Sequence, residues 1–164
     1  MPFYGFSGKK IQYTDLGTNK KVVTKERRGL RMFNSVMFSS QRLDWQTPKA
    51  LYNELDKEFA FDFDPCPHSP EFDGLEIEWG KSNFCNPPYG REIGKWIKKG
   101  VWEHDRAGKG VVFLIPSRTD TLWWHEYVMK ADEIRFVKGR LKFGDATNSA
   151  PFPSAIVIYK KREV

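Results

Sequence analysis

The stretch Ser82-Asn-Phe-Cys-Asn86-Pro87-Pro88-Tyr89-Gly90 decides the fold, because in it a short apolar segment runs into a rigid turn. Two successive prolines fix an extended backbone, so a strand that enters this turn must end at Asn86. Apolar residues then recur at spacings of three and four from Ile93 to Trp102, which predicts a helix. The continuous apolar run 111–115 that follows is typical of a buried parallel strand. This order of strand, turn, helix and strand predicts an α/β domain.

The segments on either side extend the alternation of helices and strands. Thr47 is a good N-cap and Pro48 suits the first helical position, so we expect a helix over 48–58. Together the elements predict a mostly parallel sheet with helices on both faces, and ligands in such sheets bind where strands end, as at Asp64 and Asn86. The other expected elements are strands over 59–64, 82–85, 134–137, 141–143 and 155–159 and a helix over 120–130.

Composition and charge divide the chain into two parts. The 164 residues suit one ordinary domain, and an aromatic content of 15% argues against a disordered chain. Residues 1–36 contain eight Lys and Arg and two Asp and Glu, which accounts for the net charge of +6, whereas residues 37–164 carry 19 charges of each sign. We expect a basic, loosely ordered extension over 1–36 and a compact domain over 37–164. Such an extension favours acidic partners, nucleic acid among them.

Cysteine usage and hydropathy predict the compartment. Two cysteines make no disulfide framework, the N-terminus lacks the apolar stretch of a signal peptide, and no run of 18 apolar residues occurs. We therefore expect a reduced, cytoplasmic protein without a membrane segment.

The turn Asn86-Pro87-Pro88-Tyr89 combines an amide, a carbonyl fixed by proline and an aromatic ring. An exocyclic amino group such as N6 of adenine is a poor nucleophile, because its lone pair is delocalised into the ring. The side-chain oxygen of Asn86 and the carbonyl of Pro87 offer acceptors for its hydrogens, and Tyr89 offers a ring for an unstacked base. The turn therefore favours methylation of a planar amine or amide nitrogen. A proline turn capped by Asn86, or a polyproline-type ligand, is the structural alternative.

Six sequence blocks occur in a fixed order along residues 37–160, and together they resemble the compact phage-type DNA N6-adenine methyltransferases. The blocks are Trp45-Gln-Thr47-Pro48, Phe61-Asp-Phe-Asp64-Pro-Cys66, Phe84-Cys-Asn86-Pro87-Pro88-Tyr89-Gly90, Ile115-Pro-Ser-Arg118-Thr119-Asp-Thr121 with Trp124-His125, Gly139-Arg140 with Phe143, and Pro151-Phe-Pro-Ser154.

This resemblance implies a compact Rossmann-like sheet with helices on both faces, as in S-adenosylmethionine-dependent methyltransferases. Only 22 positions separate Asp64 from Asn86, so the elements between the first strand and the Asn-Pro-Pro-Tyr strand must be reduced. The implied activity is site-specific methylation of N6 of adenine in DNA, with S-adenosylmethionine as cofactor and no metal. We expect the adenine to be flipped out of the duplex, and the sequence leaves the oligomeric state, monomer or homodimer, open. The resemblance to phage enzymes suggests evasion of host restriction-modification as the biological role.

The resemblance assigns these roles to the residues that stand at matching positions of the family's motifs. Asp64 matches the acidic residue that contacts the cofactor, although no Gly-x-Gly follows it. The catalytic residues are Asn86, Pro87, Pro88 and Tyr89; the cofactor-binding residues are Trp45, Thr47, Pro48, Asp64, Cys66 and Asn86; the nucleic-acid or substrate residues are Tyr89, Arg118, Thr119, Arg140 and Ser154.

Other interpretations stay open. The same turn would serve N-methylation of RNA or of protein glutamine, and the basic extension would suit a non-catalytic DNA-binding relative. Arg118 and Arg140 would bind the cofactor carboxylate or a DNA phosphate, or form surface ion pairs.

Two sets of residues have the chemistry of metal ligands. Asp62 and Asp64 would point to one face of an alternating strand, although Asp62 suits a solvated position. The second set lacks a paired Cys-x-x-Cys spacing, so its cysteines suit the core better than zinc. It comprises Cys66, His68 and Cys85, with His104 or His125 as a fourth ligand.

Overall fold

The computed structural model describes residues 3–4, 10–11, 46–144 and 146–162. The chain divides into two units, Met1–Leu30 and Arg31–Val164. In the first unit, β1 (Phe3–Tyr4) and β2 (Lys10–Ile11) pair antiparallel. The expected boundary between residues 36 and 37 lies outside the described residues and stays a prediction.

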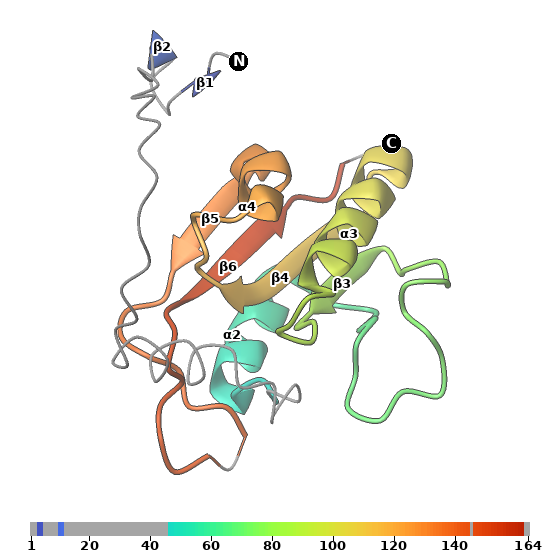
Figure 1. Ribbon diagram of the computed structural model, residues 1–164. Helices are drawn as coiled ribbons and strands as arrows, with labels where there is room; N and C mark the ends of the chain where they lie inside the picture. Colours follow the sequence, from blue (N-terminus) through green and yellow to red (C-terminus); the bar gives the residue numbers. More distant parts are fainter. Residues whose placement is uncertain (1–2, 5–9, 12–45, 145, 163–164) are drawn as a thin grey trace. The chain divides into compact units, whose positions relative to one another are not determined.

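A four-stranded sheet in the order β3-β4-β6-β5 forms the centre of the second unit (Figure 1). β3 pairs parallel with β4, whereas β6 pairs antiparallel with both β4 and β5. The strands β3, β4 and β5 therefore share one direction, but β6 between β4 and β5 corrects the expectation of mostly parallel pairing. Because β3 and β4 are parallel neighbours, their carboxyl ends lie at the same end of the sheet. The strands are β3 (Ser82–Cys85), β4 (Gly110–Pro116), β5 (Glu133–Phe136) and β6 (Ser154–Tyr159).

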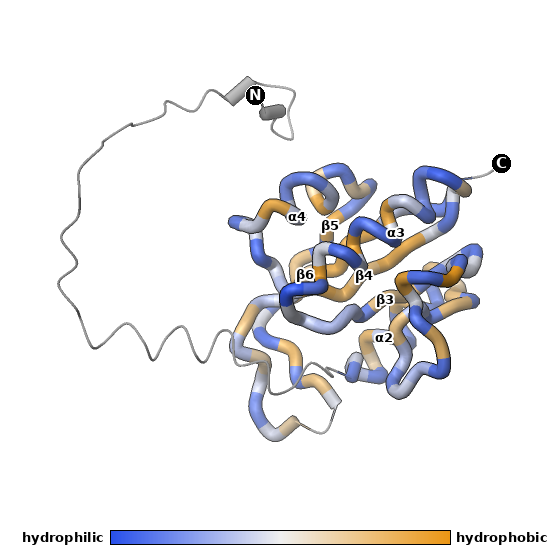
Figure 2. The backbone as a smooth tube through the Cα atoms, turned by 45° about the vertical axis from the view of Figure 1, so that its right-hand side comes forward, coloured by the Kyte–Doolittle hydropathy of each residue, from blue (hydrophilic) through white to orange (hydrophobic). Residues whose placement is uncertain are grey.

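Helices cover both faces of the sheet, as the sequence predicts. β4 is buried along its whole length, and its alternate residues belong to two apolar clusters. Phe113 lies in the cluster that α3 (Ile93–Ala107) covers, and Leu114 lies in the cluster that α2 (Lys49–Phe59) covers. Figure 2 shows this strand in hydrophobic colours between the two helices. Burial on both faces explains the continuous apolar run.

The start of α2 differs from the expectation at Thr47. Pro48 is the N-cap residue, and its carbonyl accepts from the Tyr52 N–H at 3.0 Å. Thr47 makes no cap to α2; its hydroxyl accepts instead from Asn86. At the other end the helix stops at Ala60, which adopts the left-handed conformation with φ of 48°.

The expected strand over 59–64 is wrong. α2 takes its first residue, and the N–H groups of Asp62 and Phe63 both donate to the Ser82 carbonyl, at 2.8 and 3.2 Å. Two donors on one acceptor leave no regular ladder, so the pairing reduces to a single parallel bridge between Phe63 and Asn83. This bridge still places the following residue beside the end of β3.

Two further elements differ from the sequence predictions. The helix expected over 120–130 is split into α4 (Leu122–Glu126) and the 3-10 turn η1 (Val128–Lys130), because Tyr127 between them has φ of −118° and ψ of −60°. The segment 141–143, expected as a strand, has no regular structure. The helix that follows the proline turn is confirmed, and α3 ends at Gly108 with φ of 64°.

Candidate active site

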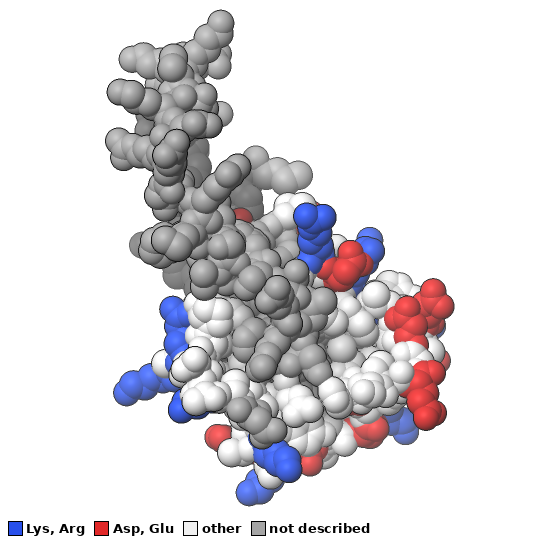
Figure 3. Space-filling model, turned by 60° about the horizontal axis from the view of Figure 1, so that its bottom comes forward, with Lys and Arg blue, Asp and Glu red and all other residues white. Residues whose placement is uncertain are grey.

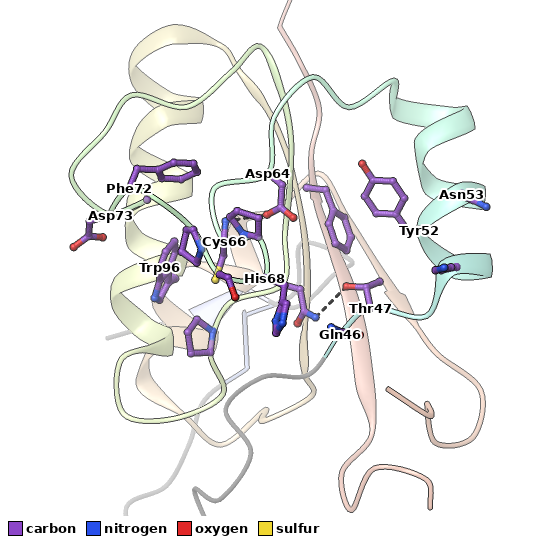
Figure 4. Close-up of a pocket in the computed structure, with 18 residues that line it drawn as sticks. Gln46, Thr47, Tyr52, Asn53, Asp64, Cys66, His68, Phe72, Asp73 and Trp96 are labelled. Carbon is purple, nitrogen blue, oxygen red and sulfur yellow. Dashed lines mark hydrogen bonds between the residues drawn. The ribbon is translucent and has the colours of Figure 1, made fainter. Parts of the chain in front are cut away.

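A cavity of about 650 Å³ opens where β3 ends and where the chain leaves its bridge to β3 at Phe63 (Figure 4). Asp64 and Asn86, the two side chains predicted at strand ends, both line it. One wall comes from α2 and the residues before it, and the other comes from the segment 64–74 and α3. The lining side chains include Gln46, Thr47, Lys49, Tyr52, Asn53, Asp64, Cys66, His68, Phe72, Asp73, Phe84, Asn86, Pro88 and Trp96.

Asn86 follows β3 directly, so a short buried strand positions it. Its Nδ2 donates to Oγ1 of Thr47 at 3.0 Å, the bond drawn as a dashed line in Figure 4. Because Thr47 accepts from the amide nitrogen, the amide plane is held and Oδ1 is directed away from Thr47. Pro87 is buried and Pro88 lines the cavity, which makes the backbone of this turn rigid. The arrangement presents an oriented acceptor.

Asp64 begins the segment 64–74 and is mostly shielded from solvent. Its Oδ1 accepts from the Cys66 N–H at 2.8 Å. Burial raises the pKa of the Asp64 carboxyl, and the hydrogen bond from Cys66 offsets only part of that rise. A poorly solvated carboxylate favours a ligand that brings a positive charge or a hydroxyl donor.

Aromatic rings line both walls of the cavity. On the α2 side, Tyr52 packs perpendicular to Phe84, with ring centroids 5.1 Å apart. On the α3 side, Phe72 stacks on Phe63 at 5.7 Å, and Trp96 is buried at 9% exposure. Ring faces with a few polar groups between them are typical of sites for small organic ligands.

Gly74 closes the segment 64–74 onto itself. Its carbonyl accepts from Nε1 of Trp79 at 2.7 Å. A Cβ at this position would overlap the carbonyl oxygen of Pro65 and lie 2.9 Å from Cζ3 of Trp96. Only glycine therefore allows the two ends of the segment to touch, and this contact holds one wall of the cavity.

Tyr89 packs beside the cavity and is not among its lining residues. Its hydroxyl donates to the Leu114 carbonyl at 3.0 Å, and its ring meets Phe143 and Phe152 edge to face at centroid distances of 6.0 and 5.4 Å. Burial raises the pKa of the Tyr89 hydroxyl well above its usual value. The ring is rigidly placed, and its stacking on a base stays a prediction.

The other residues expected at the substrate lie on three separate segments. Arg118 and Thr119 follow β4, Arg140 is exposed in the segment between β5 and β6, and Ser154 begins β6 with its side chain buried. None of these four lines the cavity.

The residues expected at the cofactor are largely brought together. Thr47, Asp64, Cys66 and Asn86 line one cavity, whereas Pro48 is not among the lining residues and Trp45 lies outside the described residues.

Sequence reasoning missed much of the cavity lining. Lys49, Tyr52 and Asn53 follow one another at spacings of three and one on α2, so the helix presents them along one edge, and a helical wheel over the residues of α2 groups them. Phe72 comes from an irregular segment, and no local pattern in the sequence points to it.

The candidate metal ligands do not gather. Among the described residues, no group of three or more His, Cys, Asp and Glu side chains has the arrangement of a metal site. His104 Nδ1 contacts the Lys109 carbonyl at 2.9 Å, and His125 Nε2 contacts the Thr119 carbonyl at 2.8 Å. No helix within the described part of the chain is long and apolar enough to cross a membrane.

Comparison with known proteins adds one match. The family described as DNA N-6-adenine-methyltransferase (Dam) matches residues 34–162, a span that contains every element from α2 to β6 and the whole cavity. Searches of curated proteins and of solved structures each found no match.

Proposed function

The chain belongs to the DNA N-6-adenine-methyltransferase (Dam) family, and we propose that it transfers a methyl group from S-adenosylmethionine to N6 of adenine at specific sites in DNA. One observation carries the proposal: Asn86 of the proline turn and the half-buried carboxyl of Asp64 line one cavity, with the amide of Asn86 held by Thr47. A nucleophile-holding acceptor beside a site for a cationic ligand is what methyl transfer to an amine requires.

The residues of the cavity fit S-adenosylmethionine. The volume of about 650 Å³ lies within the range of roughly 300–1,000 Å³ found for small-molecule sites. Tyr52, Phe72 and Trp96 offer ring faces for the purine, Asp64 offers a carboxylate for the ribose or the ammonium group, and Lys49 offers a cation for the methionine carboxylate. When bound, this cofactor supplies a methyl group on a positively charged sulfur.

The turn prepares the amino nitrogen of adenine for transfer. Oδ1 of Asn86 and the carbonyl of Pro87 would accept its two hydrogens, which favours a pyramidal nitrogen with a localised lone pair. Positive charge would develop on the nitrogen as it accepts the methyl group, and the same two acceptors would stabilise that charge. The extra proton then leaves to water, so the chain needs no general base.

Adenine inside a duplex must leave the stack to reach this cavity, at a cost of a few kcal/mol. We propose that Tyr89, whose ring is fixed beside the turn, offers a stacking surface worth about 1–3 kcal/mol to the flipped base. We also propose that the sheet is a compact Rossmann-like methyltransferase sheet. Helices on both faces and a cavity where strands end support that assignment.

Labelled cofactor and unmethylated DNA test the proposal. Purified protein should produce N6-methyladenine, detected by nucleoside analysis, while RNA and a glutamine-containing protein stay unlabelled. Asn86→Ala should abolish transfer even at saturating cofactor, with cofactor binding still detected by calorimetry, and Glu54→Ala, at an exposed position outside the cavity, should match the wild type. Wild-type incorporation by Asn86→Ala, or label found only in RNA or protein, would overturn the assignment.

A further inference from the structure

Two segments near the proline turn, Asn86-Pro87-Pro88-Tyr89, carry opposite charge. The acidic segment, residues 65–81, contains four carboxylates and one lysine, and the basic segment, residues 137–143, contains three cations and no carboxylate. Several of the acidic segment's side chains line the cavity. The carboxylates are Glu71, Asp73, Glu76 and Glu78, and the cations are Lys81 in the first segment and Lys138, Arg140 and Lys142 in the second.

The three cations of the basic segment face solvent. Lys138, Arg140 and Lys142 are exposed, whereas Leu141 is half-buried and Phe143 is buried at 3% exposure. Alternation of this kind anchors the segment by its apolar side chains and leaves the cationic side chains on the outer surface.

These cations also lack the ion pairs found elsewhere in the domain. Lys99, Lys109 and Arg135 pair with carboxylates at 2.6–2.7 Å, but within the described residues no carboxylate pairs with Lys138, Arg140 or Lys142. An unneutralised group of three cations holds small counterions in solution, and a polyanion that displaces them gains affinity from their release.

The basic segment lies against the proposed active site. Phe143 packs edge to face on Tyr89, with ring centroids 6.0 Å apart, and the Gly144 N–H donates to the carbonyl of Gln46, which lines the cavity, at 2.9 Å. Contacts at Phe143 and Gly144 therefore hold the end of the basic segment beside the proline turn.

On the other side of the proline turn, acidic side chains would repel a polyanion such as DNA. Glu71, Asp73 and Glu76 are exposed, and no ion pair joins them to a cation within the described residues. Figure 3 shows Asp and Glu side chains gathered at the right-hand edge of this end of the molecule and Lys and Arg side chains projecting from the left-hand edge. S-adenosylmethionine carries net positive charge and suits the acidic side, whereas DNA suits the basic side.

We propose that the basic segment, residues 137–143, binds the phosphate backbone of the DNA next to the flipped adenine, through Lys138, Arg140 and Lys142. The proposal rests on the proposed function and adds to it the surface that receives the duplex. The acidic segment keeps the polyanion away from the cofactor cavity.

A triple variant with Lys138, Arg140 and Lys142 replaced by Gln tests this surface in the full chain. Each phosphate contact contributes about 0.9 to the slope of log affinity against log salt, so the slope for a duplex, measured by fluorescence anisotropy, should fall by up to about 2.7. Cofactor affinity by calorimetry and the thermal midpoint should not change, because the three side chains are exposed and outside the cavity.

A matched control removes three positive charges at the opposite end of the strands. Lys160, Lys161 and Arg162 follow β6, which runs antiparallel to β4, and Arg162 N–H bonds to the Gly108 carbonyl before β4. Their triple replacement by Gln should leave the salt slope near that of the wild type. Equal loss of slope in both triple variants, or none in the first, would overturn the proposed surface even where the wild type methylates adenine. Failure of the wild type to methylate DNA would instead refute the proposed function.

Discussion

Replacement of Thr47 by valine removes the hydroxyl that accepts from Nδ2 of Asn86 at 3.0 Å and keeps the shape of the side chain. In the reacting complex Oδ1 of Asn86 must face the amino group of adenine, so Nδ2 must face residue 47. Valine offers no acceptor there. We therefore expect Thr47→Val to slow methyl transfer by acting through Asn86.

The size of the effect follows from the partner that is lost. Thr47 and Asn86 are both half-buried, so in the ligand-free Thr47→Val variant water would enter the cavity and pair with Nδ2. Cofactor and adenine exclude that water in the reacting complex, and a buried amide nitrogen without a partner costs about 1–3 kcal/mol. Since each 1.36 kcal/mol is a factor of ten in rate, kcat should fall by about 5- to 150-fold.

Steady-state kinetics with saturating DNA separates this role from direct contact with the cofactor. Thr47→Val should lower kcat and leave the KM for S-adenosylmethionine within about twofold, and Thr47→Ser, which keeps the hydroxyl, should restore most of the rate. A raised cofactor KM with unchanged kcat would refute the reasoning and place Thr47 against the cofactor. Equal losses in the serine and valine variants would refute it as well, because the loss of rate would then not follow the loss of the hydroxyl.

Three further changes probe the carboxylate, the cavity wall and the N-terminal extension. Asp64→Asn should weaken cofactor binding yet raise the thermal midpoint of the ligand-free protein. Because burial raises the pKa of the Asp64 carboxyl, this rise in thermal midpoint should be largest at neutral pH and should fade as the pH falls below the folded-state pKa. A rise that grows toward acid pH would contradict burial of the charged carboxylate as its cause. Gly74→Ala should destabilise by about 1–3 kcal/mol in urea unfolding, because its Cβ meets backbone. Gly94→Ala, whose Cβ would lie 3.6 Å from Trp123, should be neutral or stabilise by up to about 1 kcal/mol, and equal effects at the two glycines would refute the crowding argument. A chain that begins at Met37 should keep cofactor binding and methyl transfer but bind DNA with a smaller salt slope, because residues 1–36 carry the net charge; an unchanged slope would mean that they do not touch the phosphates.

The parts of the site that the sequence predicts are those set by local chemistry. Two prolines end β3 at Asn86 and the aspartate after the Phe63 bridge stands beside that end, so their meeting at one cavity follows from the rule that ligands bind where strands end. The helix over 48–58 and the apolar run 111–115 are likewise local patterns, and both are confirmed to within a residue or two.

The errors come from tertiary contacts that no local pattern carries. The alternation of residues 59–64 suits a strand, but the left-handed Ala60 and the shared Ser82 carbonyl leave only the bridge at Phe63. The antiparallel insertion of β6 depends on the path of the connection before it, which has no periodicity. Thr47 has the signature of an N-cap, and its hydroxyl instead accepts a hydrogen bond from Asn86, 39 positions away, because the fold places that half-buried amide beside it. A tertiary hydrogen bond overrides the local preference at this residue.

In the proposed function, the segment 64–74 would form a wall of the cofactor site without a glycine-rich turn after its acidic residue. S-adenosylmethionine has no phosphate to surround, so backbone N–H groups clustered at a helix N-terminus are not chemically required. What the site needs is a rigid wall with ring faces and a carboxylate. Three prolines stiffen the segment, and the contact of Gly74 with Pro65 and its hydrogen bond from Trp79 close it. Gly74 is therefore required because the backbone of the segment packs directly on it. Gly74→Ala should raise the dissociation constant for S-adenosylmethionine as well as lower the stability of the fold.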